Sequence, residues 1–232
     1  MPVLDPLLRD GHSKIMRIRS FIIAYALVLA IILFADRRPN PAPGNRYSHV
    51  VDLTLTPNTD QKSDRHSATR VIAPAELIPG TWSAAQIPAE RLVAPLVVMD
   101  LKSSPDHASQ ITLDEIAAWE ANHGIVAQGS VVAIRRVGSR NTNPTPLPIT
   151  ADAAQFLMDA RDVLGFAVET STDLTADRTL SRQLALHGAY VVDRAARFSE
   201  LSETGSLVIV APAKNNSKNP FDASVRVLAM VK

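Results

Sequence analysis

The longest hydrophobic run in the chain lies near its amino terminus, at residues 21–35 (FIIAYALVLAIILFA). It contains no charged residue, and basic residues flank it on both sides. As a helix these fifteen residues rise about 22 Å. Ile18, Ser20 and snorkelling arginines extend this towards the roughly 30 Å hydrocarbon core of a bilayer. We therefore predict one transmembrane helix over residues 18–36, which binds the lipid bilayer as an uncleaved signal anchor.

A cleaved signal peptide is the alternative interpretation, because a basic segment followed by about 7 to 15 apolar residues is typical of such peptides. Leu33 and Ala35 do not supply the pair of small residues that a cleavage site requires. Four Lys and Arg residues lie shortly before the run and three shortly after it, so the positive-inside rule favours an inner amino terminus. Residues 1–17 are then a tail on that side, and the globular domain is expected on the periplasmic or outer side of the membrane.

Beyond this run the hydrophobic residues follow a different pattern. Residues 37–47 contain three prolines and one glycine, which predicts a short, semi-extended tether without a helix. From Ser48 onward, short β-branched runs alternate with helix-like segments. We predict buried strands at residues 49–55, 96–101, 130–135, 165–168, 190–192, 206–211 and 225–231.

Helices are predicted between these strands from their start and stop signals. Thr112 and Glu115 form a capping box before the first helix, and glycines follow the first and third helices at positions 124 and 188. The predicted helices cover residues 113–123, 151–163 and 180–187. Strands that alternate with helices indicate that residues 48–232 form a single α/β domain.

Composition excludes several classes of function. The chain has 24 Lys and Arg against 23 Asp and Glu, a net charge of +1, so it lacks the basic field that nucleic-acid binding requires. It contains no cysteine, which excludes a thiolate metal site, a disulfide framework and a cysteine nucleophile. It has only 9 glycines against 16 prolines, and loops poor in glycine rarely bring their backbone close to a ligand.

Several segments, taken in order, resemble the cyclase family of metal-dependent hydrolases, also known as the kynurenine formamidase family. VVDLT at 50–54 is similar to the opening strand of that family, and the segment 78–101 resembles the stretch that follows its metal motif. Further similar blocks lie at 111–120, 129–139, 168–173, 191–201 and 207–214. The resemblance implies a swivelling β/β/α domain, an α/β fold, here preceded by one transmembrane helix. It also implies self-association as a homodimer.

The resemblance also locates the metal site of the family, which uses a motif HxGTHxDxPxH and a later His and Glu spaced twelve residues apart. Aligned on Thr69 and Pro74, the motif keeps only its first histidine among its four positions that carry the chemistry. The six positions that would carry the chemistry are occupied by His66, Arg70, Ile72, Glu76, Ser181 and Asp193.

These substitutions predict a vestigial site, with no confident catalytic residue and no metal. Arg70 supplies a guanidinium that stays protonated in proteins and repels a cation. Ile72 offers no lone pair where the family bridges two ions. We expect Arg70 to form an ion pair with Glu76 or Asp193. If a metal is retained, His66, Glu76 and Asp193 are the candidate ligands for Zn or Mn.

Three functions remain open at this point. The first is a catalytically inactive, membrane-anchored domain that acts as an accessory or structural subunit of a membrane protein complex. The second is a divergent metal-dependent hydrolase of amides or lactones, similar to an arylformamidase. The third is a sensor domain that binds an anion at Arg70.

Overall fold

One mixed sheet of eight strands organises residues 47–232, in the order β1-β8-β7-β3-β4-β5-β6-β2. The computed structural model describes residues 47–55, 68–101, 110–136, 144–214 and 225–232. The predicted anchor and most of the tether lie outside these ranges, and no helix within them is long and apolar enough to cross a membrane. The strands are β1 (His49–Asp52), β2 (Arg70–Ile72), β3 (Val93–Leu101), β4 (Val131–Arg136), β5 (Gly165–Val168), β6 (Tyr190–Asp193), β7 (Ser206–Pro212) and β8 (Val225–Val231).

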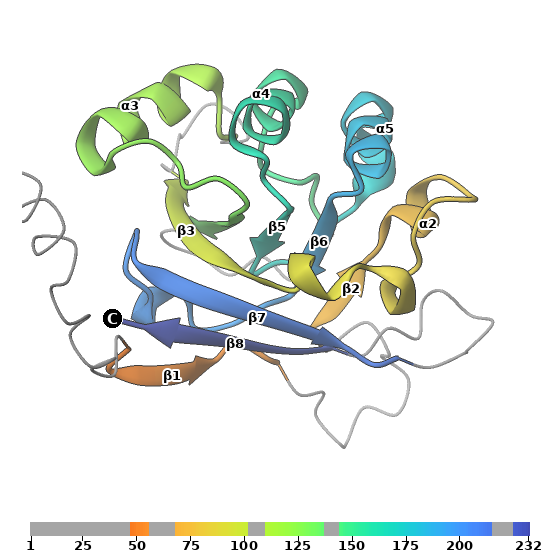
Figure 1. The fold of residues 1–232 in the computed structure, drawn as a ribbon. Coiled ribbons are helices and arrows are strands. Elements are labelled where there is room, and N and C mark those ends of the chain that lie inside the picture. Colours follow the sequence, from red (N-terminus) through yellow and green to blue (C-terminus); the bar gives the residue numbers. More distant parts are fainter. Residues whose placement is uncertain (1–46, 56–67, 102–109, 137–143, 215–224) are drawn as a thin grey trace, which may run out of the picture. The chain divides into compact units, whose positions relative to one another are not determined.

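Four central strands, β3, β4, β5 and β6, run parallel to one another. Antiparallel strands extend the sheet at both sides: β7, β8 and β1 follow β3, while β2 pairs with β6. In Figure 1 the helices lie above the parallel strands, and β7, β8 and β1 lie below them, because the sheet curls back under itself. The result is the three-layered β/β/α arrangement.

Three longer helices cover one face of the sheet: α3 (Leu113–His123), α4 (Ala151–Arg161) and α5 (Arg178–His187). The predicted capping box is present, since the amide of Glu115 donates to the Thr112 hydroxyl and the amide of Thr112 donates to the Glu115 carboxylate. The shorter elements are α2 (Pro74–Leu77) and four 3₁₀ turns, η1 (Ala84–Gln86), η2 (Ala89–Arg91), η3 (Leu174–Ala176) and η4 (Phe198–Glu200).

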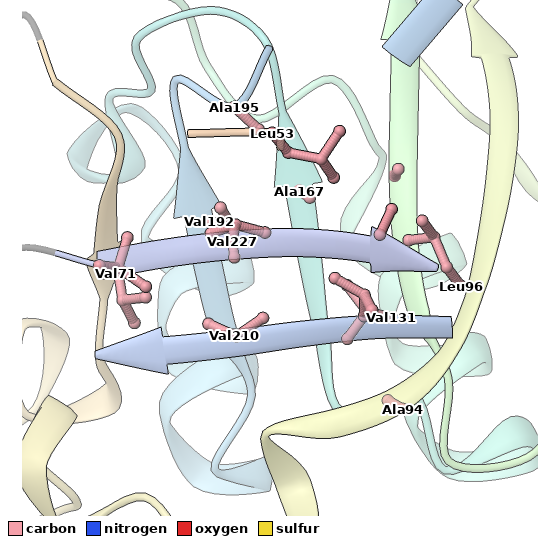
Figure 2. Close-up of a cluster of buried hydrophobic side chains, with 14 of the residues drawn as sticks. Leu53, Val71, Ala94, Leu96, Val131, Ala167, Val192, Ala195, Val210 and Val227 are labelled. Carbon is pink, nitrogen blue, oxygen red and sulfur yellow. The ribbon is translucent and has the colours of Figure 1, made fainter. Parts of the chain in front are cut away.

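Alternation along the strands creates two hydrophobic cores, one on each face of the sheet. Leu96 and Val98 of β3 point towards β7 and β8, whereas Val97 and Met99 point towards the helices. Figure 2 shows the first core, in which side chains of β7 and β8 meet those of the parallel strands. Because both faces are covered, the parallel strands are apolar over most of their length. Their charged residues lie near the carboxyl ends: Asp100, Arg135, Arg136 and Asp193.

Four of the predicted element boundaries differ from the structure by two or three residues. The first strand ends at Asp52 rather than at residue 55, and β3 begins three residues earlier than predicted, at Val93. Helix α4 ends at Arg161, because Asp162 adopts a left-handed conformation, and α5 begins at Arg178 under a cap from Asp177. Strand β2 was not predicted, because three residues are too few to show a period.

Candidate functional site

The carboxyl ends of the parallel strands meet at one edge of the sheet, and β2 begins at the same edge. In the register of the β2–β6 pair, Arg70 stands opposite Asp193. Thr69, immediately before β2, is buried, and its hydroxyl donates to the carbonyl of Arg194 at 2.6 Å and accepts from the amide of Leu55 at 2.6 Å. These bonds fix the backbone from which the Arg70 side chain extends.

The guanidinium of Arg70 contacts two carboxylates. Its Nη1 lies 3.2 Å from Oε2 of Glu76, and its Nε lies 3.4 Å from Oδ2 of Asp193. The side chains of Glu76 and Asp193 are only 4% and 2% exposed, whereas that of Arg70 is 22% exposed. We call these three residues the Arg70 cluster. The ion pair expected from the sequence is present, and it involves both candidate carboxylates rather than one.

Each carboxylate is also held by a backbone amide. Glu76 is the third residue of α2, and its Oε1 accepts a hydrogen bond from the amide of Ala73 at 3.0 Å. Oδ1 of Asp193 accepts from the amide of Thr172 at 2.7 Å. Thr172 lies in the segment 168–173 that resembles the family, but no local pattern indicates its contact with Asp193. In each of the two acids, one carboxylate oxygen therefore accepts from a backbone amide and the other accepts from the Arg70 guanidinium.

Burial dominates the electrostatics of the cluster. Desolvation raises the pKa of Glu76 above its ordinary value, against the opposing effects of the Ala73 amide and of Arg70. Desolvation likewise raises the pKa of Asp193, with Arg70 and Thr172 opposing it. One guanidinium shared between two buried carboxylates does not offset the whole cost of removing both charges from water.

The other aligned positions contribute no ligand to this cluster within the described part of the chain. Ile72 is 4% exposed and packs in the core beneath the helices. The hydroxyl of Ser181 donates to the carbonyl of Leu174 in η3 and to that of Asp177, the residue before α5. His66 lies outside the described residues.

The chemistry of the described donors does not fit a divalent cation. A metal needs lone pairs directed at a common point, but the guanidinium of Arg70 lies against both carboxylates and carries a fixed positive charge. Within the ranges that the structure describes, no group of three His, Cys, Asp or Glu side chains is placed to hold an ion. The cluster carries two carboxylates and one guanidinium, so it does not favour an anion at Arg70 either.

Comparison with known proteins identifies the family of this chain. A family model named Cyclase, described as "Putative cyclase", matches residues 31–173. The chain belongs to the cyclase family. Isatin hydrolase from Roseibium aggregatum is 27% identical to this chain over 191 residues, in a match that covers 72% of this chain and 72% of that protein. The family assignment made from the sequence is confirmed.

Solved structures share the fold. Isatin hydrolase A from Labrenzia aggregata, bound to benzyl benzoate, gives a TM-score of 0.60 at 24% identity, covering 79% of this chain and 93% of that chain. An isatin hydrolase bound to the product analogue thioisatinate gives 0.57 at 23% identity, with 83% and 85% covered. A potential metal-dependent hydrolase with cyclase activity gives 0.57 at 20% identity, with 78% and 96% covered. These likenesses confirm the cyclase-like α/β fold of the domain.

Proposed function

We propose that this chain is a cyclase-family domain that does not hydrolyse substrate and that acts as an accessory subunit of a membrane protein complex. The domain is hydrolase-like and related to isatin hydrolase. One observation carries the proposal: Arg70 stands where the family resemblance places a metal ligand, and it binds Glu76 and Asp193 at 3.2 and 3.4 Å. A fixed positive charge at this position repels a metal ion. Without a metal, the domain has no metal-activated water of the kind that the family uses for hydrolysis.

Metal content tests this proposal directly. The full chain, purified in detergent without chelator, is expected to contain less than about 0.1 Zn or Mn per chain by elemental analysis, because Arg70 opposes cation binding. Added Zn or Mn should leave its thermal unfolding unchanged, and isatin should not be ring-opened. One ion per chain that is lost in a His66→Ala variant would overturn the proposal.

A divergent hydrolase is the second candidate, and the relationship to isatin hydrolase favours it. The activity would be metal-assisted hydrolysis of an amide, aryl formamide or lactone, with His66, Glu76 and Asp193 as ligands to Zn or Mn. Metal-dependent turnover of isatin or of an aryl formamide, lost in Asp193→Asn, would identify this function.

The membrane part of the proposal is supported by the charge-free run at residues 21–35. After alkaline carbonate washing, the full chain is expected to remain in the membrane pellet, because a transmembrane helix is held by its buried apolar surface. A chain that lacks residues 18–36 should be released, which provides the control. Recovery of a soluble product that begins after residue 36 would instead indicate a cleaved signal peptide.

A further inference from the structure

A groove runs along α3, where the helix faces the end of β3 and the turn after η4. Its volume is about 230 Å³, and its lining includes Met99, Asp100, Ala118, Trp119, His123 and Glu203. We call it the α3 groove. It shares no residue with the Arg70 cluster, and strands β4, β5 and β6 separate β3 from β2 in the sheet. It is therefore a different site from the one that the family resemblance identifies.

The apolar part of the groove is held in a fixed geometry. Met99 is buried in the floor, and the indole Nε1 of Trp119 donates to the carbonyl of Val98 at 3.0 Å. The ring of His123 stacks on Trp119, with 4.7 Å between ring centroids and 27° between planes. A fixed aromatic face attracts both apolar groups and cations.

Among the residues that the structure describes, the polar part of the groove carries more negative than positive charge. Arg135 donates from Nε and Nη2 to the two oxygens of Asp100, at 2.6 and 3.0 Å, and from Nη2 to Glu203 at 3.0 Å. Its Nη1 donates to the carbonyls of Phe198 and Leu201, so this guanidinium is turned towards the protein. The side chains of Asp100 and Glu203 are each 43% exposed.

One guanidinium thus faces two carboxylates, and both carboxylates still reach solvent at the rim. Glu115, a third acid, also lines the groove. An anion entering the groove would meet these carboxylates first, and a neutral apolar molecule would gain nothing from them. The combination of an aromatic wall and an acidic rim is typical of sites that recognise organic ammonium ions.

From this geometry we infer that the α3 groove binds a small organic cation with an aromatic or alkyl body. Its ammonium group lies at Asp100 and Glu203, and its apolar body lies against Met99, Ala118 and Trp119. The volume is below the roughly 300–1,000 Å³ of pockets that hold drug-sized ligands, so the ligand is small. This site is independent of the proposed function, because no residue of the Arg70 cluster takes part.

The chain supplies its own reporter for this site, because it contains only two tryptophans. A Trp82→Phe variant of the full chain leaves Trp119 as the single indole. Phenethylammonium is expected to change its fluorescence saturably at about pH 7.5, where the amine is protonated. The neutral isostere 2-phenylethanol should bind at least about tenfold more weakly, since it lacks the charge.

A matched pair of substitutions tests the position of the site. Ala118 and Ala117 are both exposed on α3, but only Ala118 lines the groove. Ala118→Leu fills the groove and is expected to weaken phenethylammonium binding about tenfold or more, whereas Ala117→Leu should leave it unchanged. Leucine is a good helix former, so both variants are expected to fold.

Three outcomes would overturn the inference. Equal binding of 2-phenylethanol would show an apolar groove without charge recognition. A linear, unsaturable fluorescence response would show no site. A concentration-dependent increase in mass that Ala118→Leu abolishes would show that the groove is a contact between copies of this chain.

Discussion

The Arg70→Met variant is expected to lose roughly 3 kcal/mol of unfolding free energy at about pH 7.5, the lower end of the range for breaking a buried ion pair. The lower end applies because Arg70 keeps 22% exposure, whereas Glu76 and Asp193 are 4% and 2% exposed. Methionine retains much of the aliphatic part of the arginine side chain, so the loss of unfolding free energy comes chiefly from removal of the positive charge. Urea denaturation of the full chain in detergent micelles, followed by near-UV circular dichroism, measures this loss.

The unfolding free energy lost in Arg70→Met should depend on pH in a defined direction. Burial raises the pKa of Glu76 and of Asp193 in the folded state, so the folded protein holds more protons than the unfolded chain above about pH 4. Their contribution to stability is therefore complete below that pH and decreases as pH rises through the raised pKa values. Removal of Arg70 raises both pKa values further, and we expect the penalty to shrink towards about pH 4.5.

Glu76→Gln provides the control for this interpretation. Glutamine can still accept from the Ala73 amide and from Arg70, but it does not titrate. In the Glu76→Gln background, Arg70→Met should cost less than in the wild type, because only one carboxylate is left unpaired. An equal penalty at about pH 4.5 and 7.5 would contradict an electrostatic role for Arg70 and indicate that its stem packing matters instead.

Gly165→Ala is expected to destabilise the domain by about 3 kcal/mol, the upper part of the range for overpacking a core. Gly165 begins β5, and a Cβ at this position would lie 2.5 Å from the carbonyl oxygen of Tyr190 and 3.0 Å from its ring. Tyr190 is fully buried, and its hydroxyl donates to the carbonyl of Arg91 at 2.9 Å. Neither the neighbouring strand nor the ring can easily move away. The same urea denaturation measures the loss.

Gly129→Ala is the comparison for this variant. Gly129 has a positive φ of 67°, but a Cβ added there would meet nothing within 4 Å in the described part of the chain. Its substitution should cost about 1 kcal/mol from backbone strain alone. If Gly165→Ala costs no more than Gly129→Ala, β5 and β6 separate more readily than the packing indicates.

Much of the fold follows from local patterns. The β-branched runs predicted seven of the eight strands, and the Thr112 capping box and the glycines at 124 and 188 marked helix ends. These features depend on residues within one or two turns of each other. The sequence segments that resemble the family, taken in chain order, also identified it. The α3 groove had no such signal, because its two sides come from α3 and from a turn about eighty residues later in the chain.

The sequence by itself determined the α/β class and the family. The replacement of metal ligands by Arg70 and Ile72 stays an expectation from the family resemblance. The transmembrane helix at 18–36 stays a prediction. Only the tertiary structure decided that Arg70 binds both acids, since Asp193 lies 123 residues away from it. Strand β2, too short to be recognised alone, exists because it pairs with β6. These distant side chains meet only in the folded sheet, so no local sequence pattern predicts their contact.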